Sequence, residues 1–234
     1  MPIDTNVLET VRPSRRSVVR GAAWSVPVVS MAATAPAFAA SPCAKSTIVW
    51  SSLGRSGTTF TSTSISGVTV TLTLSGATTA AGNRTISTTQ TGGQSSVLRF
   101  YSTSTNNSSQ TATFSFTRTS NGQPVNVTNL SFSFLDIDSG GRSWDDRVLV
   151  NTGGFAFTIV NPTYVIGTGT SGNPFRGATS NTSADTGGSS TNGNVAVSWA
   201  ASLSSVSFTY AQDGSSNGQP FIGISNMSFQ PVLC

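Results

Sequence analysis

The chain of 234 residues contains no histidine, and only 9% of its residues are charged, with 12 Lys+Arg and 8 Asp+Glu. Without histidine it cannot form Ser-His-Asp or Cys-His nucleophile systems, nor His-based zinc or iron sites. It also lacks a run of about 20 strongly apolar residues, so we expect no transmembrane anchor. The absence of histidine excludes many classes of enzyme at once.

Small hydroxyl residues and glycine dominate what is present, with 40 Ser, 34 Thr and 23 Gly. Hydrophobic residues still make up 36% of the chain and include 13 Phe. That is enough apolar material for one sizeable core in a chain of this length. Disordered chains are poor in aromatic and β-branched residues, so we expect most of this chain to fold.

The first 39 residues have the features of an export signal. Arg15-Arg16 precede a moderately apolar stretch, Gly21 to Ala39, and Ala37-Phe38-Ala39 matches a small-x-small cleavage pattern. This block resembles the twin-arginine leaders of bacterial secreted and cell-surface proteins. We therefore expect residues 1–39 to be a signal peptide and the protein to be extracellular or associated with the cell envelope.

Removal of the leader changes the charge balance of the chain. Residues 40–234 keep eight cations and six Asp, with no Glu, which gives a formal net charge of +2. The cations are dispersed along the chain, whereas nucleic-acid binding needs a clustered basic patch. We therefore expect no nucleic-acid partner.

The two cysteines lie near the two ends of the mature chain, at Cys43 and Cys234. An exported chain with two cysteines predicts a disulfide between them, and we expect it to join terminal strands that lie side by side. Twin-arginine export, as the resemblance implies, carries folded proteins, so we expect the domain to fold before the bond forms. Lipid modification of Cys43 and a metal site are the less favoured alternatives.

From Ser46 onward the hydrophobic residues alternate with Ser and Thr, which is the period of β-strands. Each run is four to eight residues long and is bounded by turn formers. We expect an all-β fold of about ten to twelve strands in two antiparallel sheets packed face to face. The clearest predicted strands include Val68–Leu74, Thr113–Thr117, Ser131–Phe134, Phe155–Ile159, Val195–Trp199 and Val206–Tyr210.

Two segments change the parity of their apolar residues, which one unbroken strand cannot bury on one face. They are Leu130–Asp138 and Ile222–Phe229. We interpret both as bent strands that cross from one sheet to the other, which favours a jelly-roll-like sandwich. Residues 40–234 are predicted to form a single domain, with a long loop rich in Gly, Ser, Thr and Asn at 167–194.

Four of the six mature carboxylates lie within eleven residues, at Asp136, Asp138, Asp145 and Asp146. Carboxylates converging at a strand end with a glycine-containing loop are candidate calcium ligands. The favoured alternative is a turn in which they accept loop hydrogen bonds and pair with Arg142 and Arg147. We expect a bulge near Leu135 to turn Asp136 and Asp138 outward, so that no ion is needed.

Three aromatic residues, Trp144, Tyr164 and Phe175, lie in or near predicted loops, where an aromatic face can stack on a sugar ring. These are the candidate ligand-binding residues, although each is also explained as a lid over one end of the sandwich. The aspartates are a conceivable carboxylate pair for glycoside hydrolysis. Because the mature chain contains no Glu and no recognisable catalytic motif, we expect no catalytic residue.

The combination of a twin-arginine leader, a Ser/Thr-rich β-sandwich and a strand-end Asp-x-Asp resembles bacterial adhesin-like envelope domains and carbohydrate-binding modules. The resemblance implies a non-catalytic surface domain that acts by binding or as surface structure. Its partners would be cell-wall or extracellular polysaccharide, or surface proteins. The alternatives are a carbohydrate-binding module with a calcium-stabilised loop and, second, an Asp-dependent glycoside hydrolase.

Overall fold

The computed structural model describes residues 43–53, 57, 59–103, 107–141, 143–179, 188–214 and 219–232. They belong to one compact unit that spans Pro42–Cys234. The predicted leader, residues 1–39, lies outside the described residues. In the described part of the chain, no helix is long and apolar enough to cross a bilayer.

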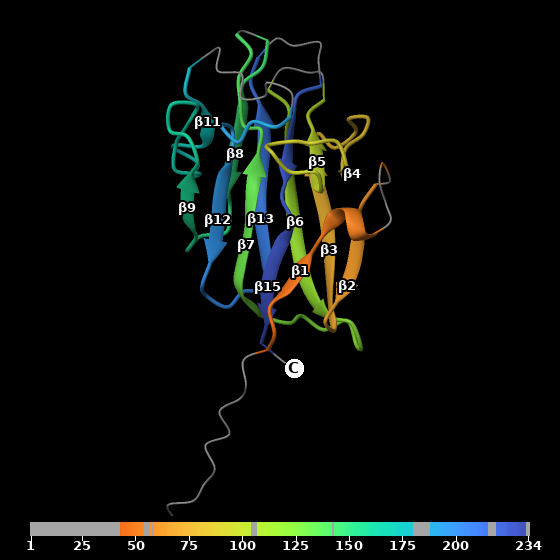
Figure 1. Cartoon of the computed structure of the whole chain (residues 1–234). Helices are drawn as coiled ribbons and strands as arrows, with labels where there is room; N and C mark the ends of the chain where they lie inside the picture. The colour runs from red at the N-terminus through yellow and green to blue at the C-terminus, as the bar shows by residue number, and fades with distance from the viewer. Residues whose placement is uncertain are drawn as a thin grey trace, which may run out of the picture. The chain divides into compact units, whose positions relative to one another are not determined.

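The all-β prediction is confirmed, because the described residues form two antiparallel sheets and one short 3-10 turn, η1 (Trp50–Leu53) (Figure 1). The eight-stranded sheet is called sheet A. In chain order it contains β1 (Ser46–Ile48), β4 (Thr85–Ser87), β5 (Val97–Tyr101), β7 (Val127–Leu135), β9 (Ala156–Ile159), β12 (Val195–Trp199), β14 (Phe221–Ile224) and β15 (Met227–Pro231).

The seven-stranded sheet, called sheet B, faces sheet A across the core. Its strands in spatial order are β10 (Val165–Ile166), β11 (Phe175–Gly177), β8 (Asp146–Val150), β13 (Ser205–Gln212), β6 (Ser109–Arg118), β3 (Val68–Gly76) and β2 (Ser62–Ile65). From β6 to β9 the chain changes sheet at every connection, which is the jelly-roll-like alternation expected. The described residues contain 15 strands, more than the ten to twelve predicted.

The core lies between the sheets because alternate residues of each strand point inward. Strand β6 shows the pattern clearly, with buried residues separated by half-buried Thr and Ser. Trp50, Trp199 and Tyr210 are all buried in this core. The sheets are joined by ring contacts such as Phe134–Phe208, whose centroids lie 5.1 Å apart.

Both predicted bends exist, but neither carries a strand into the other sheet. Strand β7 ends at Leu135, and Asp136 has a left-handed backbone with φ 65°. Strands β14 and β15 both belong to sheet A and both pair with β7, separated by a break at residues 225–226. The expectation that these strands cross between sheets was therefore wrong, since the parity change is absorbed by local irregularity within one sheet.

The long predicted loop at 167–194 is also corrected. It contains β11 and, within the described residues, a short bridge between Thr170 and Asn173. Phe175 anchors β11 in the core and is fully buried. A three-residue strand has too few positions to show a period-two pattern, so the sequence could not distinguish it from a turn.

The terminal strands lie side by side, as expected. Strand β1 pairs with β15, with Ser46 opposite Phe229, and the Gln230 side chain donates a 2.6 Å hydrogen bond to the Cys43 carbonyl. Cys234 lies outside the described residues, so the disulfide stays a prediction.

Candidate functional site

The loop that carries Asp136, Asp138 and Asp145 lies at one end of the sandwich, between the end of β7 and the start of β8. Asp146 is the first residue of β8, and its carboxylate is buried. Its Oδ1 accepts a 2.7 Å hydrogen bond from the Tyr210 hydroxyl, and its Oδ2 accepts one of 3.3 Å from the Asp138 N–H. Burial raises the pKa of Asp146 well above its usual value, and the nearby Asp138 charge raises it further.

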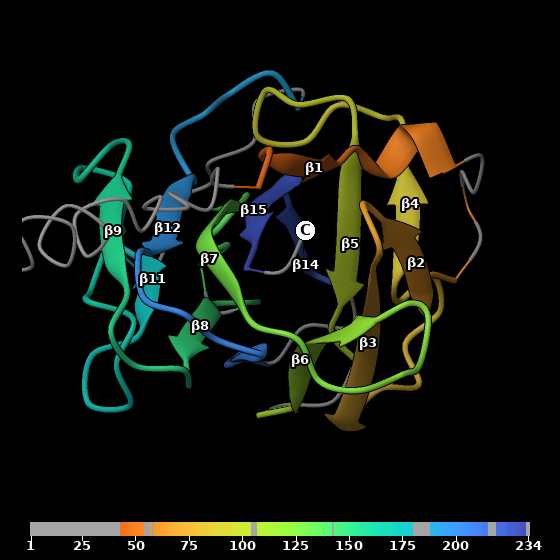
Figure 2. The ribbon, with the colours of Figure 1, turned by 90° about the horizontal axis from the view of Figure 1, so that it is seen from below.

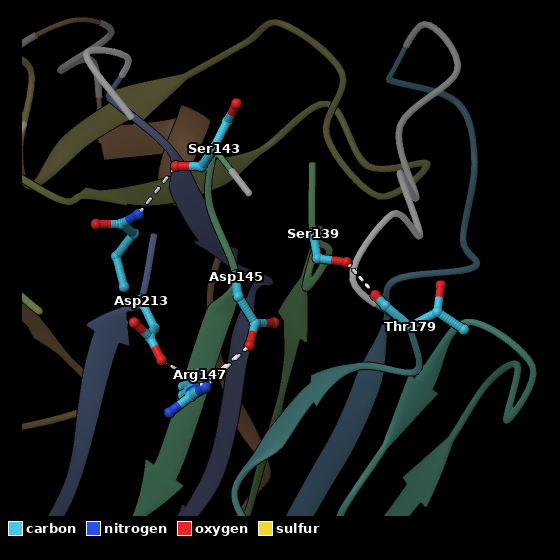
Figure 3. A network of polar contacts seen from close by, with 7 residues as sticks. Ser139, Ser143, Asp145, Arg147, Thr179 and Asp213 are labelled. Carbon is cyan, nitrogen blue, oxygen red and sulfur yellow. Dashed lines mark hydrogen bonds and ion pairs between the residues drawn. The ribbon is translucent and has the colours of Figure 1, made fainter. Parts of the chain in front are cut away.

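Asp145 points away from this buried pair and forms an ion-pair network. Arg147 contacts the Asp145 carboxylate at 3.2 Å and that of Asp213 at 2.7 Å (Figure 3). Burial raises the pKa of Asp145, while Arg147 lowers it. The predicted pairing of loop aspartates with arginine is confirmed for Asp145, whereas Arg142 lies outside the described residues.

Asp136 and Asp138 are buried, with exposed fractions of 7% and 8%. The expectation that a bulge turns them outward was wrong. Strand β7 ends at Leu135, before the left-handed Asp136, and the side chains of both aspartates stay buried. Trp144 donates a 2.8 Å hydrogen bond from its indole Nε1 to Asp138. Its ring lies directly over Gly140, where an added Cβ would approach ring atoms to 2.3 Å.

The four predicted metal ligands are therefore not all brought together. Asp136, Asp138 and Asp146 are close enough to influence one another electrostatically, while Asp145 is paired with Arg147. Within the described ranges, no group of three or more acidic, histidine or cysteine side chains fits a metal ion. A calcium ion at this loop stays a prediction.

The raised pKa of Asp146 has a consequence for stability. A carboxyl whose pKa is higher in the folded chain takes up a proton on folding, so its contribution to stability increases as pH falls toward the unfolded pKa. Asp146→Asn cannot ionise. We expect the melting temperature of wild type to rise relative to that of this variant as the pH is lowered from 7 toward 4. If the melting temperatures of the two proteins changed in parallel with pH, the raised pKa of Asp146 would be contradicted.

The three candidate ligand-binding aromatics do not form a common exposed platform. Phe175 is fully buried and contacts Phe157 with centroids 5.1 Å apart, so its prediction as a ligand-binding residue was wrong. Tyr164 packs against the core and Trp144 covers Gly140. Both are half-buried, as expected of lids over the end of the sandwich.

A pocket of about 360 Å³ lies instead on the outer face of sheet A, over β9, β12, β7 and β15. The strand register places its small side chains in rows across the sheet. One row is Ala156, Ser198, Ser131 and Ser228, and a second row is Thr158, Ala196 and Ser133. No charged residue lines this pocket, called here the sheet A pocket.

Several hydroxyls of the sheet A pocket have no protein partner among the described residues. They belong to Ser131, Ser133, Ser198 and Thr158. Another pocket hydroxyl, that of Ser228, bonds to the Thr47 hydroxyl at 2.8 Å. On the outer face of sheet B some hydroxyls also bond to one another, as in the 2.9 Å contact between Thr111 and Thr209.

Asn226 adds an oriented amide to the pocket. Its Oδ1 accepts hydrogen bonds from the Trp50 backbone N–H at 3.2 Å and from the Ser96 hydroxyl at 3.0 Å. These donors fix the carbonyl end of the amide, and no acceptor for its NH₂ group lies within the described part of the chain. The amide therefore keeps two unused donors.

Sequence reasoning identified the outward Ser and Thr of single strands but missed this pocket. The alternation around Phe132 and Phe134 already predicted that Ser131 and Ser133 face outward. The sequence did not show that these side chains are neighbours, because β9, β12, β7 and β15 lie far apart along the chain.

Comparisons of the chain with protein-family models, with curated proteins and with solved structures gave no match.

Proposed function

We propose that this chain is an exported, non-catalytic β-sandwich that acts at the cell surface or outside the cell by binding, with a segment of neutral polysaccharide held in the sheet A pocket. The observation that carries this proposal is the group of four pocket hydroxyls, on Ser131, Ser133, Ser198 and Thr158, that have no protein partner among the described residues. A hydroxyl both donates and accepts hydrogen bonds, which is what the hydroxyls of a sugar require. An uncharged pocket offers no counter-charge to an ionic ligand.

The absence of titratable side chains from the pocket supports a binding role over hydrolysis. General acid–base catalysis needs a side chain that exchanges protons near neutral pH within reach of the substrate. The pocket lining contains no carboxylate or amine. The aspartates that a hydrolase would use are engaged elsewhere, Asp146 with Tyr210 and Asp145 with Arg147.

The chemistry of the pocket predicts weak binding at each site. Net hydrogen-bond contributions are about 0.5–1.5 kcal/mol each, and no exposed aromatic ring provides a stacking platform among the outward side chains of the two rows. Useful retention would then come from many copies acting on a repetitive polymer. That regime is suited to adhesion and surface structure.

The test is to fill the pocket. Ala196 is exposed at the centre of the second row, so Ala196→Trp places a large side chain over Ser133 and Thr158. The matched control is Thr73→Trp, at an exposed position on the outer face of sheet B. We expect wild type and the control to bind insoluble cell-wall or plant polysaccharide equally, and Ala196→Trp to bind at least about tenfold more weakly.

Binding is measured as the fraction of protein depleted from solution over a range of polysaccharide concentrations. Failure of wild type to bind any neutral polysaccharide contradicts the proposal. Equal retention of both Trp variants places the ligand outside the sheet A pocket and contradicts its location.

A further inference from the structure

Strand β9 is an open edge of sheet A. It pairs with β12 on one side, and no strand of the described part of the chain pairs with its other side. It lies at the outer margin of the molecule in two perpendicular views (Figures 1 and 2). An open edge presents unpaired backbone N–H and C=O groups, which are a template for pairing with another strand.

The register shows which backbone groups of β9 are unpaired. The Val160 N–H donates a 3.0 Å hydrogen bond to the Asn194 carbonyl, on the β12 side. Backbone groups of an antiparallel strand alternate in direction along the chain. Phe157 and Ile159 therefore direct their N–H and C=O groups away from β12, toward the open side.

Strand β9 carries none of the charged side chains that protect many open edges. Natural edges are kept short, or carry charges or proline that discourage pairing. No charged residue lies between Arg147 and Arg176, a stretch that includes β9. Two of the three exposed large hydrophobic residues of the described chain, Phe157 and Val160, lie in or beside β9, with exposed fractions of 40% and 52%.

The other open edges are better protected. Strand β10 has two residues, and β1 and β4 have three each. Lys45 directly precedes β1. Strand β2 is four residues long, like β9, but its side chains are mostly Ser and Thr and only one is exposed. Residues 156–158 of β9 are all exposed.

We propose that β9 is a self-association surface, at which two copies of this chain pair their β9 strands in antiparallel fashion about a twofold axis. A second copy fits because an uncharged strand meets its own copy without like-charge repulsion. A twofold axis brings the same patch of both subunits together and satisfies the outward groups of Phe157 and Ile159 reciprocally. The pairing joins two copies of sheet A into one continuous sheet and covers Phe157 and Val160 of both copies.

The dimer is expected to be reversible. Stable interfaces bury about 1,200–2,000 Å² in total, and two strands of four residues bury less. Association should therefore depend on protein concentration. Strand β9 also borders the sheet A pocket through Ala156, Phe157 and Thr158, but the two proposals are tested separately, because the readout here is oligomeric state in the absence of polysaccharide.

The experiment is sedimentation velocity over a wide range of protein concentration, on wild type, Phe157→Lys and Val232→Lys. Phe157→Lys places two like charges on the same face of the joined strands, close to the twofold axis. Val232→Lys is the matched control, because Val232 is 49% exposed and lies at the other end of the chain. We expect wild type and Val232→Lys to dimerise with increasing concentration, and Phe157→Lys to stay monomeric at least about tenfold beyond their midpoint.

Hydrogen exchange on wild type gives a second readout that needs no variant. The amides of Phe157 and Ile159 should exchange rapidly in dilute solution and become protected as concentration rises. A monomer at all concentrations overturns the proposal, as does a dimer that Phe157→Lys leaves intact. Protection of these amides that does not depend on concentration also overturns it, because the strand is then covered within its own chain.

Discussion

Phe208→Ala is expected to lower the free energy of unfolding by about 3–5 kcal/mol. Phe208 lies on β13 of sheet B, is 1% exposed and contacts the rings of Phe134 and Phe100 on sheet A, with centroids 5.1 and 5.4 Å away. Its removal leaves a cavity at the point where aromatic rings from the two sheets meet. Because interiors are close-packed, neighbouring rings cannot fully close that space.

The measurement is urea or thermal unfolding at a low protein concentration. The expected loss corresponds to a fall in melting temperature of roughly 6–20 °C for a domain of this size. Phe157→Ala is the control, since the same ring is removed from an exposed position and should cost much less. Equal destabilisation by the two variants would show that the inter-sheet cluster is not where the stability resides.

Tyr210→Phe is expected to destabilise the fold by about 1–3 kcal/mol at neutral pH, although it removes only one oxygen atom. The Tyr210 hydroxyl donates to the buried carboxylate of Asp146 at 2.7 Å. Without it, one carboxylate oxygen loses its donor in a site that water does not reach. The hydrogen bond lowers the pKa of Asp146, so its loss should raise that pKa further.

The pH dependence distinguishes this explanation from simple loss of packing. Protonated Asp146 depends less on a donor than the carboxylate does, so the destabilisation should shrink as pH falls toward 4. Tyr101→Phe is the control, because its half-exposed hydroxyl accepts only a 3.3 Å hydrogen bond from Arg99. A destabilisation of Tyr210→Phe that is constant with pH would contradict a role through Asp146.

The strand pattern was predictable from sequence where a strand is long enough to show its period. Strands β3, β6, β7, β9, β12 and β13 were all predicted, and each has two or more inward residues separated by Thr, Ser, Ala or similar small residues. Strands β4, β10 and β11 have three residues or fewer, so a single inward side chain is their entire signal.

The functional surfaces were harder to predict, because they depend on contacts between distant segments. Phe175 was assigned to a loop since its neighbours are Gly, Ser and Asn, yet Phe157 and Gly169 pack around its ring. The burial of Asp136 and Asp138 follows from the path of the loop after β7, which no local pattern encodes. The sheet A pocket needed the register of four strands before its serines could be placed together.

The pairing of β1 with β15 also determines when the fold can be completed. Strand β15 lies between β1 and β7, so the strand furthest along the sequence of this domain occupies an interior position in sheet A. Until β15 has been synthesised and has left the ribosome, β1 has no partner in its sheet and one side of β7 is unpaired along its first half. Completion of this sandwich therefore waits for nearly the whole domain, and it is limited by closing a loop almost as long as the domain itself.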